Sequence, residues 1–137
     1  MNSDLWIIHC DDDDILRRHC KEIIIENFPD VNLIQCKNGI LVIEQLKKLE
    51  EKKLALIISD LHMKCENGDG KSLYNYIKKN GIDCPFLLIT GDATQKFEEF
   101  QNDEKFYSAY KPYDSETLVS MIAKLSPSIK RNRNGTR

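Results

Sequence analysis

The chain has 137 residues, of which 41% are hydrophobic and 31% charged, with only six glycines and four prolines. This length and composition are typical of one globular domain, and they exclude a fibrous or intrinsically disordered chain. No apolar run approaches the roughly 20 residues needed to span a bilayer, so we expect no membrane insertion. The sequence starts without a signal peptide's charged flank and apolar stretch, and its five cysteines lack paired spacings. We therefore expect reduced thiols and a cytoplasmic location.

The net charge of −2 is unevenly distributed along the sequence. Residues 126–137 carry four of the 20 basic residues and none of the 22 acidic ones, so 16 basic against 22 acidic residues leave 1–125 with a net charge of −6. We interpret 1–125 as the folded domain and 126–137 as a basic, disordered tail. No aromatic residue interleaves with the charges of this tail, so we do not expect nucleic-acid binding.

Five short apolar runs, each of strand length, alternate with stretches of helical period. The runs occupy residues 5–10, 31–36, 54–59, 85–90 and 105–110. Between and after them, apolar residues at helical spacing predict helices around 16–28, 40–49, 73–77 and 118–125. The segment 92–102 is the weakest helix prediction, because only Phe97 and Phe100 would anchor it.

Strands that alternate with helices predict an α/β domain with a parallel sheet covered on both faces. The continuously apolar runs 54–59 and 85–90 are typical of the central strands of such a sheet, whereas 31–36 suits an edge. Ligands of open doubly wound sheets bind at the carboxyl ends of the strands. The residues that follow each predicted strand are therefore the candidate functional residues.

Chemically active side chains end or directly follow four of the five predicted strands: Asp11 and Asp12, then Asp60, Thr90 and Lys111. Because these strand ends meet at one edge of the sheet, three carboxylates would lie close together there. Such a cluster is costly unless a cation neutralises it, and oxygen ligands without His or Cys favour Mg²⁺. The sequence therefore predicts a magnesium site at this edge.

Over about residues 5–125 the sequence resembles the receiver domain of two-component response regulators. The resemblance rests on the acid pair after the first strand, ISDLHMKCENG around Asp60, LLITGDA around Thr90 and YKPYD around Lys111. It implies a flavodoxin-like, doubly wound sheet of five parallel strands in the order 2-1-3-4-5 with helices on both faces. We expect a stand-alone receiver, since no output domain follows in this sequence.

The resemblance also implies a role for each site residue. Asp60 would accept a phosphoryl group from a histidine kinase or a histidine phosphotransfer protein, and a carboxylate is a known nucleophile for such an aspartyl-phosphate. Mg²⁺ would be bound by Asp11, Asp12, Asp60 and the backbone carbonyl of His62. Thr90 and Lys111 would contact the phosphoryl oxygens, and phosphorylation would switch the binding of an unidentified downstream protein. Such a chain is a signalling phosphoacceptor, and beyond its own phosphorylation and dephosphorylation we expect no enzyme activity.

Three positions differ from the usual pattern of this family. Lys64 stands where a proline usually lies four residues past the acceptor, and Asp14 stands where a proline usually follows the acidic stretch. Ser108 replaces the aromatic residue that commonly lies three positions before the lysine. The resemblance further predicts a cis peptide bond between Lys111 and Pro112.

Other interpretations of the acidic run remain open at this point. Asp13 and Asp14 are suited to the start of a helix, where carboxylates cap free amide groups. The run also resembles the nucleophile motif of haloacid-dehalogenase-like phosphatases, with Asp11 as nucleophile and Asp13 as acid and base. A third possibility is a receiver-like binding module that is never phosphorylated, although all five site residues are present.

Overall fold

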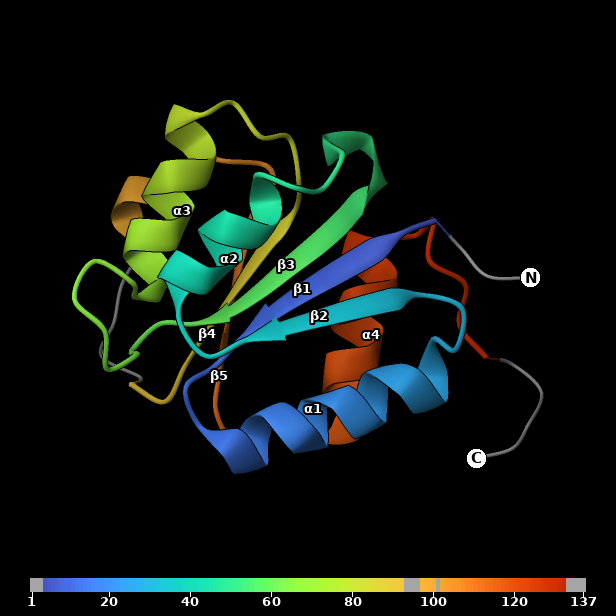
Figure 1. Cartoon of the computed structure of the whole chain (residues 1–137). Coiled ribbons are helices and arrows are strands. Elements are labelled where there is room, and N and C mark those ends of the chain that lie inside the picture. Colours follow the sequence, from blue (N-terminus) through green and yellow to red (C-terminus); the bar gives the residue numbers. More distant parts are fainter. Residues whose placement is uncertain (1–3, 93–96, 101, 133–137) are drawn as a thin grey trace.

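The computed structural model describes residues 4–92, 97–100 and 102–132. Its centre is a sheet of five parallel strands in the order β2-β1-β3-β4-β5 (Figure 1). The strands are β1 (Trp6–Cys10), β2 (Asn32–Cys36), β3 (Leu54–Asp60), β4 (Phe86–Thr90) and β5 (Phe106–Tyr110). The predicted strands, their order and the central place of β3 are thereby confirmed.

Four α-helices are found in the described part of the chain, together with two short 3-10 helices. They are α1 (Asp14–Asn27), α2 (Gly39–Leu46), α3 (Gly70–Lys79) and α4 (Ser115–Leu125), with η1 (Glu51–Lys53) and η2 (Glu98–Phe100). Each α-helix begins at a side-chain cap that accepts backbone N–H groups, from Asp13, Asn38, Asp69 and Asp114 respectively. These caps satisfy amide groups that have no partner within a helix.

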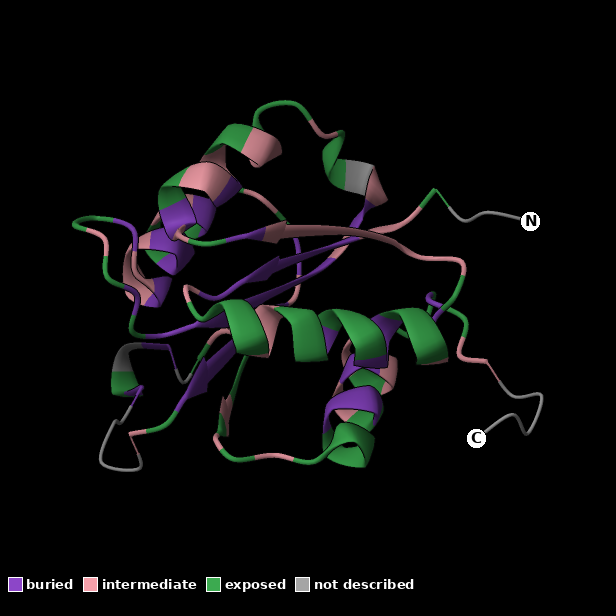
Figure 2. Cartoon of the chain, turned by 60° about the horizontal axis from the view of Figure 1, so that its bottom comes forward, coloured by how far each residue is buried: buried purple, intermediate pink, exposed green. Residues whose placement is uncertain are grey.

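The helices cover both faces of the sheet, as the alternating pattern predicts. Helices α2 and α3 lie on one face, and α1 and α4 on the other (Figure 1). Successive residues of a strand point to opposite faces, so Ile8 and Cys10 join the first core while Ile7 joins the second. Strand β3 is almost wholly buried, and the outward side of α1 is exposed (Figure 2).

The connection between β4 and β5 differs from the weak helix prediction for 92–102. Within the described residues it contains only the three-residue helix η2, and residues 93–96 and 101 lie outside the described part of the chain. The two predicted anchors are nevertheless buried, Phe97 to 9% and Phe100 to 5% exposure. They pack against Phe106 at the start of β5.

The segment after α4 differs in part from the expected disordered tail. The Ser126 hydroxyl donates to the carbonyl of Ala55 at 2.6 Å, Ile129 is buried, and the amide of Asn132 donates to the carbonyl of Asn27 at 2.6 Å. Residues 126–132 therefore continue along the face formed by α1 and α4. The rest of the predicted tail, 133–137, lies outside the described residues.

Two further features complete the fold. The Lys111–Pro112 peptide bond is cis, as predicted. Over the described residues no helix combines the length and the apolar character that crossing a membrane would require.

Candidate functional site

The parallel register of the strands brings the predicted residues together at one edge of the sheet. Cys10 pairs with Ser59 across β1 and β3, so Asp11 and Asp60 are neighbours. Thr90 pairs with Tyr110 across β4 and β5, and the amide of Lys111 donates to the carbonyl of Thr90 at 2.8 Å. Strand pairing alone therefore assembles residues that are far apart in the sequence.

The three predicted acidic ligands form one cluster. Asp11, Asp12 and Asp60 each offer a carboxylate oxygen, and these oxygens lie within 4.8 Å of one another. Asp11 and Asp60 are only 4% and 8% exposed. At about 4 Å, like charges repel by about 1 to 4 kcal/mol depending on screening. An all-oxygen, triply acidic site of this kind fits a hard divalent cation such as Mg²⁺.

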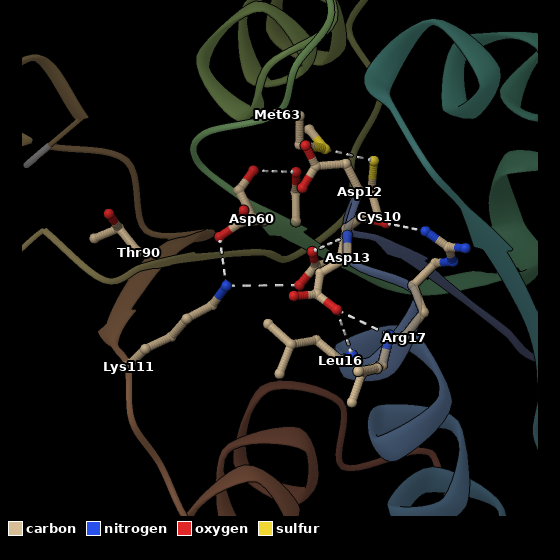
Figure 3. Close-up of polar contacts among 12 residues, drawn as sticks. Cys10, Asp12, Asp13, Leu16, Arg17, Asp60, Met63, Thr90 and Lys111 are labelled. Carbon is tan, nitrogen blue, oxygen red and sulfur yellow. Dashed lines mark hydrogen bonds and ion pairs between the residues drawn. The ribbon is translucent and has the colours of Figure 1, made fainter.

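Lys111 places a positive charge next to this cluster. Its Nζ lies 3.0 Å from Oδ1 of Asp60 and 3.6 Å from Oδ2 of Asp11 (Figure 3). Burial raises the pKa of the Asp60 and Asp11 carboxyls, and the charge of Lys111 opposes that rise. Burial would lower the pKa of the Lys111 ammonium, but the hydrogen bonds and charges of Asp60 and Asp11 together outweigh it and raise that pKa. The lysine therefore remains charged and offsets part of the acidic charge.

Thr90 ends β4 and is completely buried. Its Oγ1 accepts a hydrogen bond from the amide of Asp92 at 3.0 Å. In Figure 3 the Thr90 side chain lies to one side of Lys111 and the aspartates, and no dashed line joins it to them. Its predicted contact with a phosphoryl group stays a prediction.

Asp13 and Asp14 lie at the start of α1, as the helix-cap interpretation predicts. Oδ1 of Asp13 accepts the amides of Ile15 at 2.8 Å and Leu16 at 3.2 Å (Figure 3), and Asp14 pairs with Arg17. The carboxylate of Asp13 therefore caps the N-terminus of α1. The four consecutive aspartates divide into two that face the site and two that begin the helix.

The loop 61–69 lies beside the acidic cluster and carries two positions of interest. His62 is exposed, and the ligand role of its carbonyl stays a prediction. The backbone amide of Lys64 donates to Oδ2 of Asp12 at 2.9 Å. Sequence reasoning missed this contact because its donor is a backbone N–H, a group that every residue type except proline carries.

Comparison with known proteins bears on the fold. No protein-family model matches the sequence, and no curated protein matches it. Many solved structures do. The signal receiver domain of an HD domain-containing protein from Pseudomonas fluorescens Pf-5 is 19% identical, with a TM-score of 0.73 over 90% of this chain and 94% of that one.

Two further structures show the same similarity. A CheY-like response regulator receiver domain protein from Methanospirillum hungatei JF-1 is 20% identical, with a TM-score of 0.73 over 91% of this chain and 96% of that one. The receiver domain of the Francisella response regulator 1452 is 18% identical, with a TM-score of 0.70 over 90% and 98%. The chain therefore has the flavodoxin-like fold of response-regulator receiver domains.

Proposed function

We propose that this chain is a phosphoacceptor receiver of a two-component or phosphorelay pathway. The observation that carries the proposal is the position of Asp60, which ends the central strand next to two further carboxylates and 3.0 Å from the Lys111 ammonium. Receiver-like structures elsewhere give the fold but not the chemistry. The chemistry is inferred from these side chains.

The phosphoryl acceptor in this proposal is Asp60. One of its carboxylate oxygens attacks the phosphorus of a phosphohistidine, a phosphorus–oxygen bond forms, and the phosphorus–nitrogen bond breaks. The imidazole of the donor leaves and takes up a proton. A Mg²⁺ ion held by Asp11, Asp12, Asp60 and the carbonyl of His62 would neutralise the acids and the incoming phosphoryl oxygens. Transfer of this kind depends mainly on positioning and charge neutralisation.

Lys111 and Thr90 would bind the phosphoryl group once it is attached. The Lys111 ammonium already contacts Asp60, so it can pair with the new oxygens. The Thr90 hydroxyl accepts from the amide of Asp92 and still has its own hydrogen to donate. If the hydroxyl turned toward the phosphoryl group, its hydrogen bond with the Asp92 amide would change and Asp92 would move. Such a difference between the two states is what a switch requires.

The proposal extends to the rest of the molecule. Residues 1–125 form the receiver, and its partners are a histidine kinase or phosphotransfer protein and a downstream protein. Five free cysteines suit the reducing cytoplasm. The chain would act as a signalling phosphoacceptor, with no reaction beyond its own phosphorylation and dephosphorylation.

The phosphatase alternative requires Asp13 as acid and base next to Asp11 as nucleophile. Asp13 instead accepts two amide hydrogen bonds at the start of α1, and this alternative gives Asp60 no role. An unphosphorylated binding module would have no need of a buried acidic cluster with a paired lysine. Both alternatives are therefore less well supported than the receiver.

The test is incubation with a small acyl phosphate and Mg²⁺, followed by intact-mass and peptide mass spectrometry. We expect one added phosphoryl group on Asp60, which disappears in Asp60→Asn and when a chelator removes the metal. Asp13→Asn is the matched control and should be labelled fully, since asparagine is an equally good helix cap. A phosphoryl group on the Asp60→Asn variant, mapped to Asp11, would overturn the proposal in favour of the phosphatase.

A further inference from the structure

We propose that the backbone amide of Lys64 is a positioning group for the metal site: it holds Asp12 so that the carboxylate can bind the cation. This inference rests on the metal site of the proposed function. Its starting point is the hydrogen bond from the Lys64 N–H to Oδ2 of Asp12 at 2.9 Å, between residues 52 positions apart.

Each of the three clustered carboxylates has a different group that holds it. Oδ1 of Asp11 accepts the amide of Asp13 at 2.9 Å, and Asp60 is paired with Lys111. Asp12 is the most exposed of the three and borders on two other negative charges. Repulsion would favour its rotation into solvent. The Lys64 amide opposes that rotation by binding one oxygen, and the second oxygen can still bind a cation.

The loop that carries this amide is fixed at both ends. The amide of Leu61 donates to the carbonyl of Ile89 at 2.8 Å, and the amide of Gly70 donates back to the carbonyl of Leu61 at 3.0 Å. Between them, Met63 is buried and its Sδ accepts from Sγ of Cys10 at 3.3 Å. Lys64 follows directly, so the position of its amide is determined by neighbouring buried groups.

A second contact holds the far end of the loop to α2. The amide of Gly39 donates to the carbonyl of Gly68 at 2.8 Å. A Cβ at position 39 would lie 2.9 Å from that carbonyl oxygen, so the two segments can approach this closely because residue 39 is glycine. The donor at Lys64 therefore belongs to a loop that is held in place, so it can orient Asp12 as outer contacts orient metal ligands.

The contact depends on a departure from the family pattern that the sequence resembles. Proline, the usual residue four positions past the acceptor, has no N–H and could not donate to Asp12. The Lys64 side chain is exposed, and the contact with Asp12 is made by the backbone. The proposal therefore concerns the backbone amide of Lys64, and any effect of the side-chain charge must be measured separately.

Proline can be placed here as a test. Lys64 is the central residue of a three-residue turn closed by the amide of Cys65 and the carbonyl of Met63 at 2.7 Å. The common form of this turn has φ near about −75° at its centre, which the proline ring permits. Lys64→Pro should therefore fold, and circular dichroism with thermal unfolding verifies that it does.

The experiment compares Mg²⁺ affinity, by calorimetric titration, between Lys64→Ala and Lys64→Pro. Both variants lack the ammonium, and only the second lacks the amide. We expect Mg²⁺ to bind the proline variant about tenfold more weakly than the alanine variant, the usual loss when an outer contact of a metal ligand is removed. Equal affinities in the two variants would overturn the proposal.

Amide hydrogen exchange gives a second readout, which needs neither metal nor proline. In the presence of chelator, the Lys64 amide of the unsubstituted protein should exchange at least about tenfold more slowly than in Asp12→Ala, because a hydrogen bond protects an amide. Equal rates would show that the contact does not persist in solution and would overturn the proposal. A protected amide in a protein that binds no Mg²⁺ would instead refute the metal site and the proposed function, while the contact itself would stand.

Discussion

Two sides of the molecule are built in different ways: the acidic side, at the carboxyl edge of the sheet, and the aromatic side, beside the amino ends of β4 and β5. On the acidic side, individual groups hold one another by directional contacts, such as Lys111 with Asp60 and the Lys64 amide with Asp12. On the aromatic side, the interior is a cluster of rings that packs without directional bonds between them. Its rings, with centroids 4.2 to 6.4 Å apart, are Tyr74, Phe86, Phe97, Phe100 and Phe106.

This difference has a physical consequence. The acidic side should respond to the loss of single polar atoms, because each carboxylate depends on one or two donors. The aromatic side should respond to loss of volume, because packing energy grows with the number of atoms in contact. The following predictions separate the two responses.

The largest expected effect is on the acidic side. Asp12→Ala should abolish phosphoryl labelling by an acyl phosphate, because removing a ligand weakens metal binding by more than the roughly 10- to 100-fold typical of outer contacts. The neighbouring variant Asp14→Asn is the control and should be labelled like the unsubstituted protein, since Asp14 pairs with Arg17 away from the cluster. Full labelling of Asp12→Ala in intact-mass spectra would exclude Asp12 as a ligand.

A loss of volume on the aromatic side should act on stability instead. Phe100→Ala should lower the free energy of unfolding by about 3 to 5 kcal/mol, the usual cost of removing a buried phenyl ring. Urea unfolding followed by circular dichroism measures this, and Tyr107→Ala, at a position that is 39% exposed, should cost far less. At temperatures where Phe100→Ala remains folded, its labelling should be unchanged. A parallel loss of labelling would show that the two sides are not independent.

The third effect is a pH dependence on the acidic side. His9 lies on β1 two residues before Asp11, and its Nδ1 is 3.0 Å from Nε2 of Gln35. Burial, followed by the charges of Arg17 and Lys111, lowers the pKa of His9 from 6.5 to about 4. As the pH falls below 6.5, the unfolded chain takes up a proton at this residue before the folded protein does. Folding stability is therefore lost between pH 6.5 and 4, by about 3 kcal/mol in total.

Urea unfolding at several pH values, with chelator present, tests this loss. His9→Gln should remove this loss. The difference in free energy of unfolding between the unsubstituted protein and the variant should therefore shrink or reverse as the solution is acidified. Asp11 and Asp60 act in the opposite direction, because their raised pKa values mean that the folded protein takes up protons first as the pH falls. Both proteins share that contribution. An identical pH dependence in both would show that His9 is not held neutral.

Much of this arrangement could be predicted from the sequence. Short apolar runs locate the strands and stretches of helical period locate the helices. Polar residues that directly follow apolar runs locate Asp11, Asp60 and Lys111 at one edge. These predictions succeed because a parallel sheet places the carboxyl ends of its strands side by side, and this does not depend on how individual side chains pack. The division of the acidic run between cluster and helix cap also follows from ordinary capping preferences.

Other features depend on contacts that no residue pattern encodes. The Lys64 amide is a backbone donor, and its direction is determined by a turn and by the burial of Met63. The segment 126–132 has a single apolar side chain, Ile129, whose burial depends on the space available beside α1 and α4. The pattern around η2 predicts that two phenylalanines anchor a longer helix. In the described residues they flank or belong to the three-residue helix η2, and both pack in the aromatic cluster.

The loop 61–69 also provides a natural labelling position. Cys65 is the one cysteine of five that is not buried. Burial raises the pKa of Cys36 to about 11 and that of Cys20 to about 12, and such thiols react slowly because only the thiolate attacks an electrophilic reagent. A maleimide dye should therefore attach at one site in the unsubstituted protein, next to the residue whose amide holds Asp12. Its fluorescence would follow the arrival of a cation or a phosphoryl group in real time, without any engineered cysteine.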